Sequence, residues 1–391
     1  MGSGRKARVL LLTALAAAIA GGAAAGPRPE ASAQPDKSAN VRLVEHFAAS
    51  GYGEGSDLDF DGRRVYAAYF PRGRGAGGIR ILDARSARPR ELGFVRCPGY
   101  QNDVATVRKG LVALGYHSSQ CGPSRHGLRL IDVSNPRRPR FLGSVSIPGG
   151  GTHTITAYPG KPLIYASPGG FSSERAWRTE YVVDVSNPRR PRIAARFDPV
   201  TAGCHDVTFH FERGRKLAFC AGDEETQIWD VASPLKPEIV GRIDNPAIEF
   251  HHSVAVTSDG ELAVVGDESG KSNCAGGPTG AIFAYDVSDP AAPEERGWFA
   301  IPRGPTTDPL TLVGDYGCTA HNFEFLRGTR LLAAAWYWGG MDVVDWSDPD
   351  APEEVAHYRS PRTNYWSAYW HRGRIYANGR FGTDVFSVGG L

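Results

Sequence analysis

The feature of this sequence that most constrains its fold is a phrase that recurs along almost the whole chain. Each copy is an apolar strand ending in Asp, then Val-Ser-Asn/Asp-Pro or a close variant, a second Pro and another apolar strand. The copies begin at Asp132, Asp184, Asp230, Asp286 and Asp345, and a degenerate copy begins at Asp83. Successive copies are 46 to 59 residues apart, which is enough for four strands with their loops. A period of this size predicts a solenoid or a propeller.

Between these phrases lie two further strands joined by a glycine turn. Seven such turns can be counted: Asp61-Gly62, Lys109-Gly110, Pro159-Gly160, Arg213-Gly214, Asp259-Gly260, Arg327-Gly328 and Arg372-Gly373. The composition agrees, because 48 Gly and 28 Pro beside 2 Met favour short strands and frequent turns over long helices. The chain is therefore expected to be all-β, with seven blades.

The two ends of the repeat array predict how it closes. The seventh unit has a third strand near residues 383–386, and no fourth strand follows it before Leu391. Residues 41–47 have the pattern of a fourth strand, and no complete unit precedes them. We therefore expect a seven-bladed β-propeller over residues 41–391, closed by an N-terminal strand that completes the last blade and removes the open sheet edges.

The repeat phrase also resembles a known family. The stretch LRLIDVSNP at residues 128–136 and its copies are similar to the LVIVD repeat of β-propeller proteins found among exported proteins. The resemblance covers about residues 41–391 and implies the propeller fold. It implies no particular reaction, because the family has no single established chemistry. The copy at Asp83 departs from the pattern, since residues 84–87 read Ala-Arg-Ser-Ala.

The N-terminus has the pattern of a secretory signal peptide. Arg5, Lys6 and Arg8 precede an apolar run at residues 9–20, and small residues lead to a cleavage site after Ala25. That run of about 12 residues is short of the roughly 20 that span a bilayer. We expect a signal peptide at 1–25, a flexible Pro-, Ala- and Ser-rich linker at 26–40, and a secreted protein without a membrane span after cleavage. Cleavage after Ala33 is an alternative.

The net charge of the chain limits the class of partner that it is expected to bind. The expected signal peptide carries three basic residues and no acidic ones, so its removal leaves the chain close to neutral. A chain without a basic excess argues against a nucleic-acid partner. We expect a monomer whose partner is an unknown extracellular ligand or protein.

The six cysteines are even in number, as expected for an oxidising compartment. Cys97 and Cys121 flank the turn at Lys109-Gly110 almost symmetrically, and Cys204 and Cys220 flank the turn at Arg213-Gly214 in the same way. Partners equidistant from a hairpin turn meet across two antiparallel strands, within disulfide reach. This predicts the pairs Cys97–Cys121 and Cys204–Cys220, and leaves Cys274 with Cys318 on loops of adjacent blades.

Four of the seven expected first strands begin with histidine: His153, His205, His252 and His321. First strands line the channel of a propeller, so these side chains should form an arc around one mouth. Imidazoles without thiolates suit transition metals. Copper and iron are the expected ions, with a precedent in architecture alone from two propeller groups, the iron-dependent carotenoid cleavage oxygenases and the copper-linked methanethiol oxidases. The alternative is a structural role in which the rings hydrogen-bond neighbouring backbone.

Carboxylates end two of the second strands beside these histidines, in Gly222-Asp223-Glu224 and Gly266-Asp267-Glu268. Asp223, Glu224, Asp267 and Glu268 are candidates for orienting an imidazole or for acting as a general base, and the alternative is that they are solvated turn residues. Long loops at 117–127, 167–180, 269–280 and 302–320 should share this face. Two functions follow: extracellular binding or scaffolding through the loop-rich face, and a metal-dependent oxidase or oxygenase using copper or iron.

Overall fold

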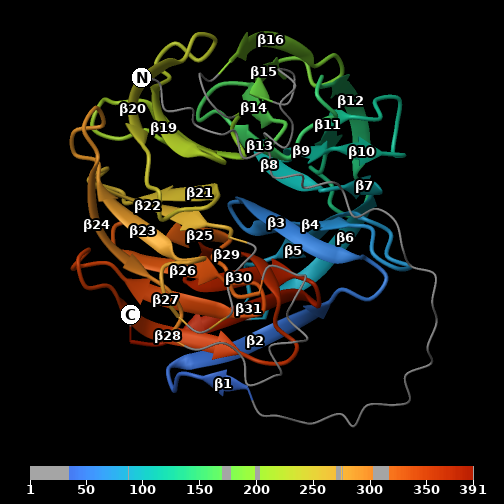
Figure 1. Cartoon of the computed structure of the whole chain (residues 1–391). Helices are drawn as coiled ribbons and strands as arrows, with labels where there is room; N and C mark the ends of the chain where they lie inside the picture. Colours follow the sequence, from blue (N-terminus) through green and yellow to red (C-terminus); the bar gives the residue numbers. More distant parts are fainter. Residues whose placement is uncertain are drawn as a thin grey trace, which may run out of the picture. The chain divides into compact units, whose positions relative to one another are not determined.

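The computed structural model of the chain describes residues 35–86, 88–169, 178–198, 203–269, 274, 276–302 and 317–390. The expected signal peptide, 1–25, and residues 26–34 of the expected linker lie outside these ranges. The described residues form 31 β-strands, so the all-β expectation is confirmed (Figure 1). In the same ranges, no helix has the length and apolar character needed to cross a bilayer.

Five sheets contain four antiparallel strands each, in chain order, as expected for propeller blades. The first two are β3 (Glu54–Asp61), β4 (Arg64–Phe70), β5 (Gly78–Asp83) and β6 (Arg90–Arg96), and β8 (Asp103–Arg108), β9 (Leu111–Tyr116), β11 (Gly127–Asp132) and β12 (Arg140–Ser146). The next three are β13 (Thr154–Ala157), β14 (Leu163–Ser167), β15 (Glu180–Asp184) and β16 (Arg192–Phe197); β17 (Asp206–His210), β18 (Leu217–Gly222), β19 (Glu225–Asp230) and β20 (Glu238–Ile243); and β21 (His251–Val256), β22 (Leu262–Asp267), β23 (Ile282–Asp286) and β24 (Glu294–Phe299). The glycine of all seven expected turns has a positive φ, between 57° and 79°, which explains the residue choice there.

The other large sheet joins nine strands, and this differs from seven separate sheets. It contains β25 (Asn322–Phe325), β26 (Leu331–Ala335), β27 (Met341–Asp345), β28 (Glu353–Arg359), β29 (Tyr365–His371), β30 (Arg374–Gly379), β31 (Gly382–Val388), β2 (Val41–Ala48) and β1 (Asp36–Lys37). Two antiparallel runs of four strands meet through a short parallel pairing of β25 with β29. A two-stranded ribbon, β7 (Gly99–Tyr100) with β10 (Ser118–Ser119), stands apart from these sheets.

The N-terminal strand pairs with the end of the chain, as expected. β2 runs antiparallel to β31, from Val41 opposite Val388 to Ala48 opposite Gly382. The shorter β1 lies inside the expected linker range and pairs with β28. The two ends of the described chain are thus held in one sheet (Figure 1).

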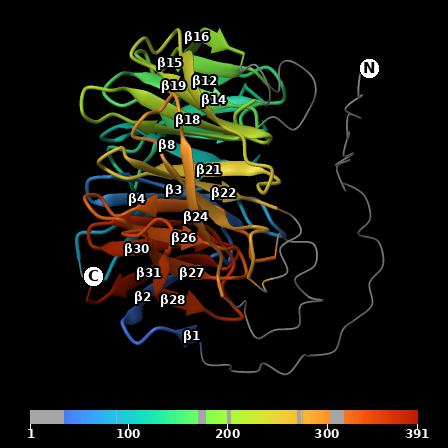
Figure 2. The same cartoon turned by 60° about the vertical axis from the view of Figure 1, so that its left-hand side comes forward.

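The first strand of each unit lies beside the first strand of the next. This succession runs β3, β8, β13, β17, β21, β25, β29, and β29 lies in turn beside β3. Figure 2 shows the successive sheets from a second direction. Apolar clusters fill the spaces between neighbouring sheets, for example Ile79 and Ile81 of β5 with Val104 of β8 and Leu114 of β9. The first strands therefore enclose a common central space.

A small residue in the fourth strand lets adjacent sheets approach closely. Gly93 and Gly241 each face the carbonyl oxygen of the first proline in the next Asp phrase, Pro136 and Pro290 respectively. Gly297 donates its backbone N–H to Pro349 O at 2.9 Å in the same way. The repeated Asn/Asp-Pro turn therefore docks on the neighbouring sheet.

We expect Gly241→Val to destabilise the protein by about 1 to 3 kcal/mol, because a Cβ there would lie 1.8 Å from Pro290 O and force the two sheets apart. Glu238→Val, at an exposed position of the same strand, is the control and should change stability by less than about 0.5 kcal/mol. Urea unfolding followed by tryptophan fluorescence measures both. Equal stabilities would contradict the docking role of Gly241.

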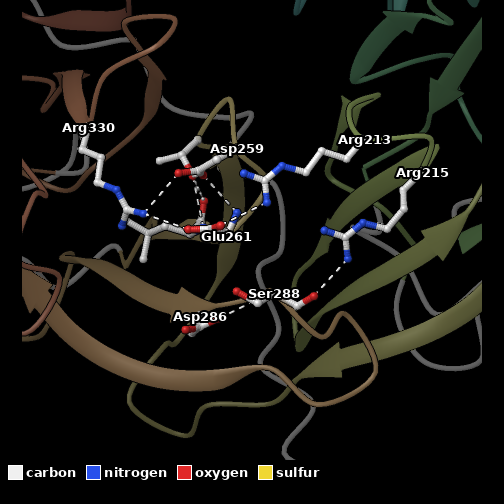
Figure 3. Close-up of polar contacts among 9 residues, drawn as sticks. Arg213, Arg215, Asp259, Glu261, Asp286, Ser288 and Arg330 are labelled. Carbon is white, nitrogen blue, oxygen red and sulfur yellow. Dashed lines mark hydrogen bonds and ion pairs between the residues drawn. The ribbon is translucent and has the colours of Figure 1, made fainter.

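Polar contacts also join neighbouring sheets at the hairpin turns between first and second strands. Figure 3 shows Arg330 reaching Asp259 and Glu261, at 3.2 and 3.4 Å, and Arg213 reaching Glu261 at 3.0 Å. Arg215 donates to the backbone oxygen of Ser288 at 3.0 Å. Exposed pairs of this kind contribute at most about 1 kcal/mol each, so they add less to the fold than the apolar clusters.

The three expected disulfides are confirmed: Cys97–Cys121, Cys204–Cys220 and Cys274–Cys318. Their Cα atoms lie 5.0, 5.2 and 5.0 Å apart. Three disulfides suggest a protein that folds in an oxidising compartment outside the cytoplasm.

Candidate metal centre

Four histidines stand side by side at one end of the central space, each at the start of a first strand. They are His153, His205, His252 and His321, and we call them the histidine arc. Successive ring centroids are 4.0, 4.2 and 4.0 Å apart. None of the four residues is more than 7 % exposed. The arrangement follows from register, because the same position on adjacent first strands faces the same point of the axis.

Burial keeps these imidazoles neutral. It lowers the pKa of all four histidines well below the usual value, and neighbouring imidazoles lower it further. Neutral imidazole is the form that binds a metal ion. His321 Nδ1 lies 2.6 Å from the backbone oxygen of Trp366 and donates to it, so the lone pair belongs to Nε2.

Among the four candidate carboxylates, Glu268 reaches the histidine arc. Its Oε2 lies 3.5 Å from His252 Nε2, and its Oε1 lies 3.4 Å from His321 Nε2. Tyr337 donates its hydroxyl to Oε1 at 2.5 Å. Burial raises the pKa of Glu268 to about 8, and the tyrosine opposes that shift. Glu268 is thus a carboxylate held between two imidazoles and a phenol.

The other three carboxylates have different positions. Asp267 accepts the backbone N–H groups of Glu249, Phe250 and Gly280, and so ties together the segments that precede β21 and β23. Asp223 forms a backbone bridge with His251. Within the described ranges, no contact joins Asp223 or Glu224 to the histidine arc.

His251 faces away from the arc, because successive side chains of a strand point to opposite faces. Its Nδ1 lies 2.9 Å from Thr226 Oγ1, in the neighbouring sheet. The residue is fully buried, so its ring belongs to the packing between β19 and β21. It is not a candidate ligand.

His117 extends the arc and was missed from the sequence. Its Nε2 lies 3.0 Å from His153 Nδ1, and burial lowers its pKa to about 4. The feature that identifies His117 is the pairing register of the second strand that precedes it. Gly115 pairs with Asp103, and Gly266 pairs with Ser253 at the same position of another sheet. His117 lies two residues after Gly115, and Glu268 lies two residues after Gly266. In both sheets, the residue just beyond the second strand therefore places its side chain at the arc.

The donor set fits a transition metal. His205, His252 and Glu268 each offer one ligand atom, and these three atoms lie within 4.8 Å of one another. The buried ring of His252 has weak polar contacts among the described residues: Glu268 Oε2 lies 3.5 Å from Nε2, and neither ring nitrogen makes a hydrogen bond of normal geometry. A metal ion would satisfy these buried nitrogens better. Two imidazoles and a carboxylate suit iron, copper or zinc.

A small cavity of ≈ 20 Å³ adjoins the arc. It is lined by the arc together with Trp366 and polar residues of the neighbouring first strands. A volume of this size holds about one water molecule, so the space next to the rings would admit an ion with little solvent. The expected loops of this face lie partly outside the described residues, in particular 170–177, 270–273 and 303–316.

Comparison with known proteins agrees with the repeat analysis. The family model described as the LVIVD repeat matches residues 124–146 and 334–360. The first match covers β11 and β12, and the second covers β27 and β28 with the end of β26. Both contain the third and fourth strands and the Asp phrase between them. No curated protein sequence matches the chain.

Proposed function

We propose that this LVIVD-repeat chain is an exported seven-bladed β-propeller that binds one transition metal ion, copper or iron, at the histidine arc. Support for seven blades comes from the seven first strands that follow one another around the central space. Support for export comes from the three disulfides.

The observation that carries the proposal is the position of Glu268 between His252 Nε2 and His321 Nε2, at 3.5 and 3.4 Å. Two ligands that each lie about 2.1 Å from one ion are roughly 3 to 3.5 Å apart. The two histidines approach different oxygens of Glu268. The compact set is His205, His252 and Glu268, whose ligand atoms lie within 4.8 Å of one another, and His321 lies beside the second oxygen as a further candidate.

Each of these residues would have its own role in binding the ion. The imidazoles would supply neutral nitrogen donors, and Glu268, on losing its proton, would supply the negative charge that offsets the ion. Tyr337 holds Glu268 in place through its hydrogen bond, and the backbone oxygen of Trp366 fixes the ring of His321. A bound copper or iron ion would supply one-electron or Lewis-acid chemistry at the buried end of the axis.

Metal titration of the purified mature protein tests the proposal. We expect about one copper or iron ion per chain, and we expect His252→Ala to weaken binding roughly 100-fold or more. Glu268→Gln keeps the size and the hydrogen bond to Tyr337 but loses the charge, and it should weaken binding at least tenfold. Elemental analysis after dialysis and a competition titration measure both.

Two control variants match these changes. His46→Ala removes a partly exposed histidine on β2, and Asp223→Asn removes a carboxylate that no described contact joins to the arc. Both should bind metal as the wild type does. A wild type that retains no metal, with all variants folded by circular dichroism, would contradict the proposal and favour extracellular binding through the loop-rich face.

A further inference from the structure

A second and larger cavity lies along the axis, beyond the small cavity of the arc. Its volume is ≈ 690 Å³, and residues of all seven first strands line it. The buried charges on its wall are all acidic: Asp57, Asp59, Asp103, Asp206 and Glu324. The arginine among the lining residues, Arg327, has an exposed side chain paired with Glu212. The described wall of the channel therefore holds five buried acidic side chains and no buried Lys or Arg.

Four oxygen-bearing side chains line both cavities: Asp57, Asp103, Asp206 and Asn322. We call them the oxygen ring. Each of the four comes directly after a residue that lines the small cavity: Asp57 after Ser56, Asp103 after Asn102, Asp206 after His205 and Asn322 after His321. The oxygen ring thus separates the arc from the wider channel.

The oxygen ring contains acceptors that the protein leaves without a donor. Asn322 is 7 % exposed, and its Oδ1 has no hydrogen-bond partner among the described residues. Asp57 Oδ1 is also buried without a partner there, although the Asp57 carboxyl group accepts hydrogen bonds from the Tyr369 hydroxyl and the Leu58 N–H. By contrast, both oxygens of Asp59 accept backbone N–H groups, from Phe60 and Thr106. Asn322 Oδ1 thus faces both cavities without a donor, which points to a ligand that accepts lone pairs.

The charge of the oxygen ring also favours a cation as its ligand. Asp103 accepts backbone N–H groups from Val104 and Ile155, at 2.7 and 2.6 Å, yet burial still raises its pKa well above the usual value. Burial also raises the pKa of Asp57 to about 7, and the nearby Asp206 charge adds to the shift. Negative groups that repel one another in a buried channel are stabilised by a cation between them.

We propose that the oxygen ring binds a calcium ion, separate from the metal ion of the histidine arc. Carboxylate and amide oxygens without nitrogen or sulfur donors suit a hard divalent cation. Calcium accepts six to eight oxygen ligands in irregular geometry, including water. The wide cavity below the ring leaves room for those waters, which suits calcium better than the strict octahedron of magnesium.

Calorimetric titration of the purified mature protein with calcium chloride tests this site. We expect one calcium ion per chain, and at least a tenfold weaker affinity in Asp57→Asn. Asp59→Asn is the matched control, because it removes an equal charge from the same strand, and Asp59 lines the wide cavity but not the small one. It should change calcium affinity by less than about threefold, since only the long-range charge term is lost.

Two further measurements test the calcium site. Glu268→Gln should bind calcium as the wild type does, which separates this site from that of the transition metal. Calcium should raise the unfolding temperature of the wild type and of Asp59→Asn but not that of Asp57→Asn. Absence of calcium binding by the wild type, or equal loss in Asp57→Asn and Asp59→Asn, would overturn the proposal.

Discussion

Deletion of residues 26–50 is expected to leave the chain unable to hold its native fold. The deletion removes β2, whose seven backbone pairs with β31 form the outer edge of the last sheet. It also removes Val41, which is 1 % exposed and packs in the same apolar cluster as Tyr358 and Phe386. The open edge of β31 would then be free to pair with other chains. We expect aggregation, or loss of cooperative unfolding, by size-exclusion chromatography and calorimetry.

Shorter deletions give the controls. Removal of residues 26–34 keeps β1 and β2 and should leave the unfolding temperature unchanged. Removal of residues 26–38 should cost a few degrees, because Asp36 and Lys37 pair with β28 and Ser38 bonds to His357. If the deletion of 26–50 unfolds at the wild-type temperature as a monomer, β2 does not close the structure.

Arg359→Met is expected to destabilise the protein by about 3 to 5 kcal/mol, because it leaves a buried carboxylate without its cation. Arg359 is 2 % exposed, and its Nη2 donates to both oxygens of Asp342, at 2.8 and 2.7 Å. The same nitrogen donates to Glu354 Oε2 at 2.5 Å. Burial holds the pKa of Asp342 well above its usual value even though the arginine opposes this shift.

An exposed pair serves as the comparison. Arg296 forms two hydrogen bonds with Asp350, at 2.9 and 2.7 Å, so its geometry resembles the buried pair while its surroundings do not. Arg296→Met should cost no more than about 1 kcal/mol. The double variant Asp342→Leu with Arg359→Met should recover part of the loss, since no lone charge stays buried. Urea unfolding of all three measures this, and equal costs for the two single variants would contradict the account.

The sequence was sufficient wherever a property depends on periodicity along the strand. The repeat spacing located the hairpins, and equal distances from two glycine turns predicted the pairs Cys97–Cys121 and Cys204–Cys220. The histidine arc was predictable for the same reason, because one position in a repeated strand must face one point of the axis. The fourth-strand pattern at residues 41–47 identified β2 before any contact was known.

Register at the strand ends was not predictable. Gly222-Asp223-Glu224 and Gly266-Asp267-Glu268 are the same tripeptide, yet only Glu268 reaches the arc. At β18 the glycine pairs with Glu225 across a tight turn, and Asp223 takes a positive φ of 55°. At β22 the aspartate continues the strand and pairs with His251. Gly266 pairs at the position that Ala221 has in β18, so Glu268 takes the position of Asp223. This one-residue shift in strand pairing depends on the conformation of the loop that follows the tripeptide. The tripeptide sequence alone does not determine that conformation.

The sequence alone therefore determined the strands, their order, the disulfides and the set of histidines, because each of these depends on residues at fixed spacing along the chain. Only the tertiary structure decided which groups meet across the axis. Glu268 between two imidazoles, His117 beside His153, and the oxygen ring of Asp57, Asp103, Asp206 and Asn322 all join residues from different sheets. Their distances depend on how the sheets pack around the central space, and the glycine positions that face a neighbouring proline turn set that packing.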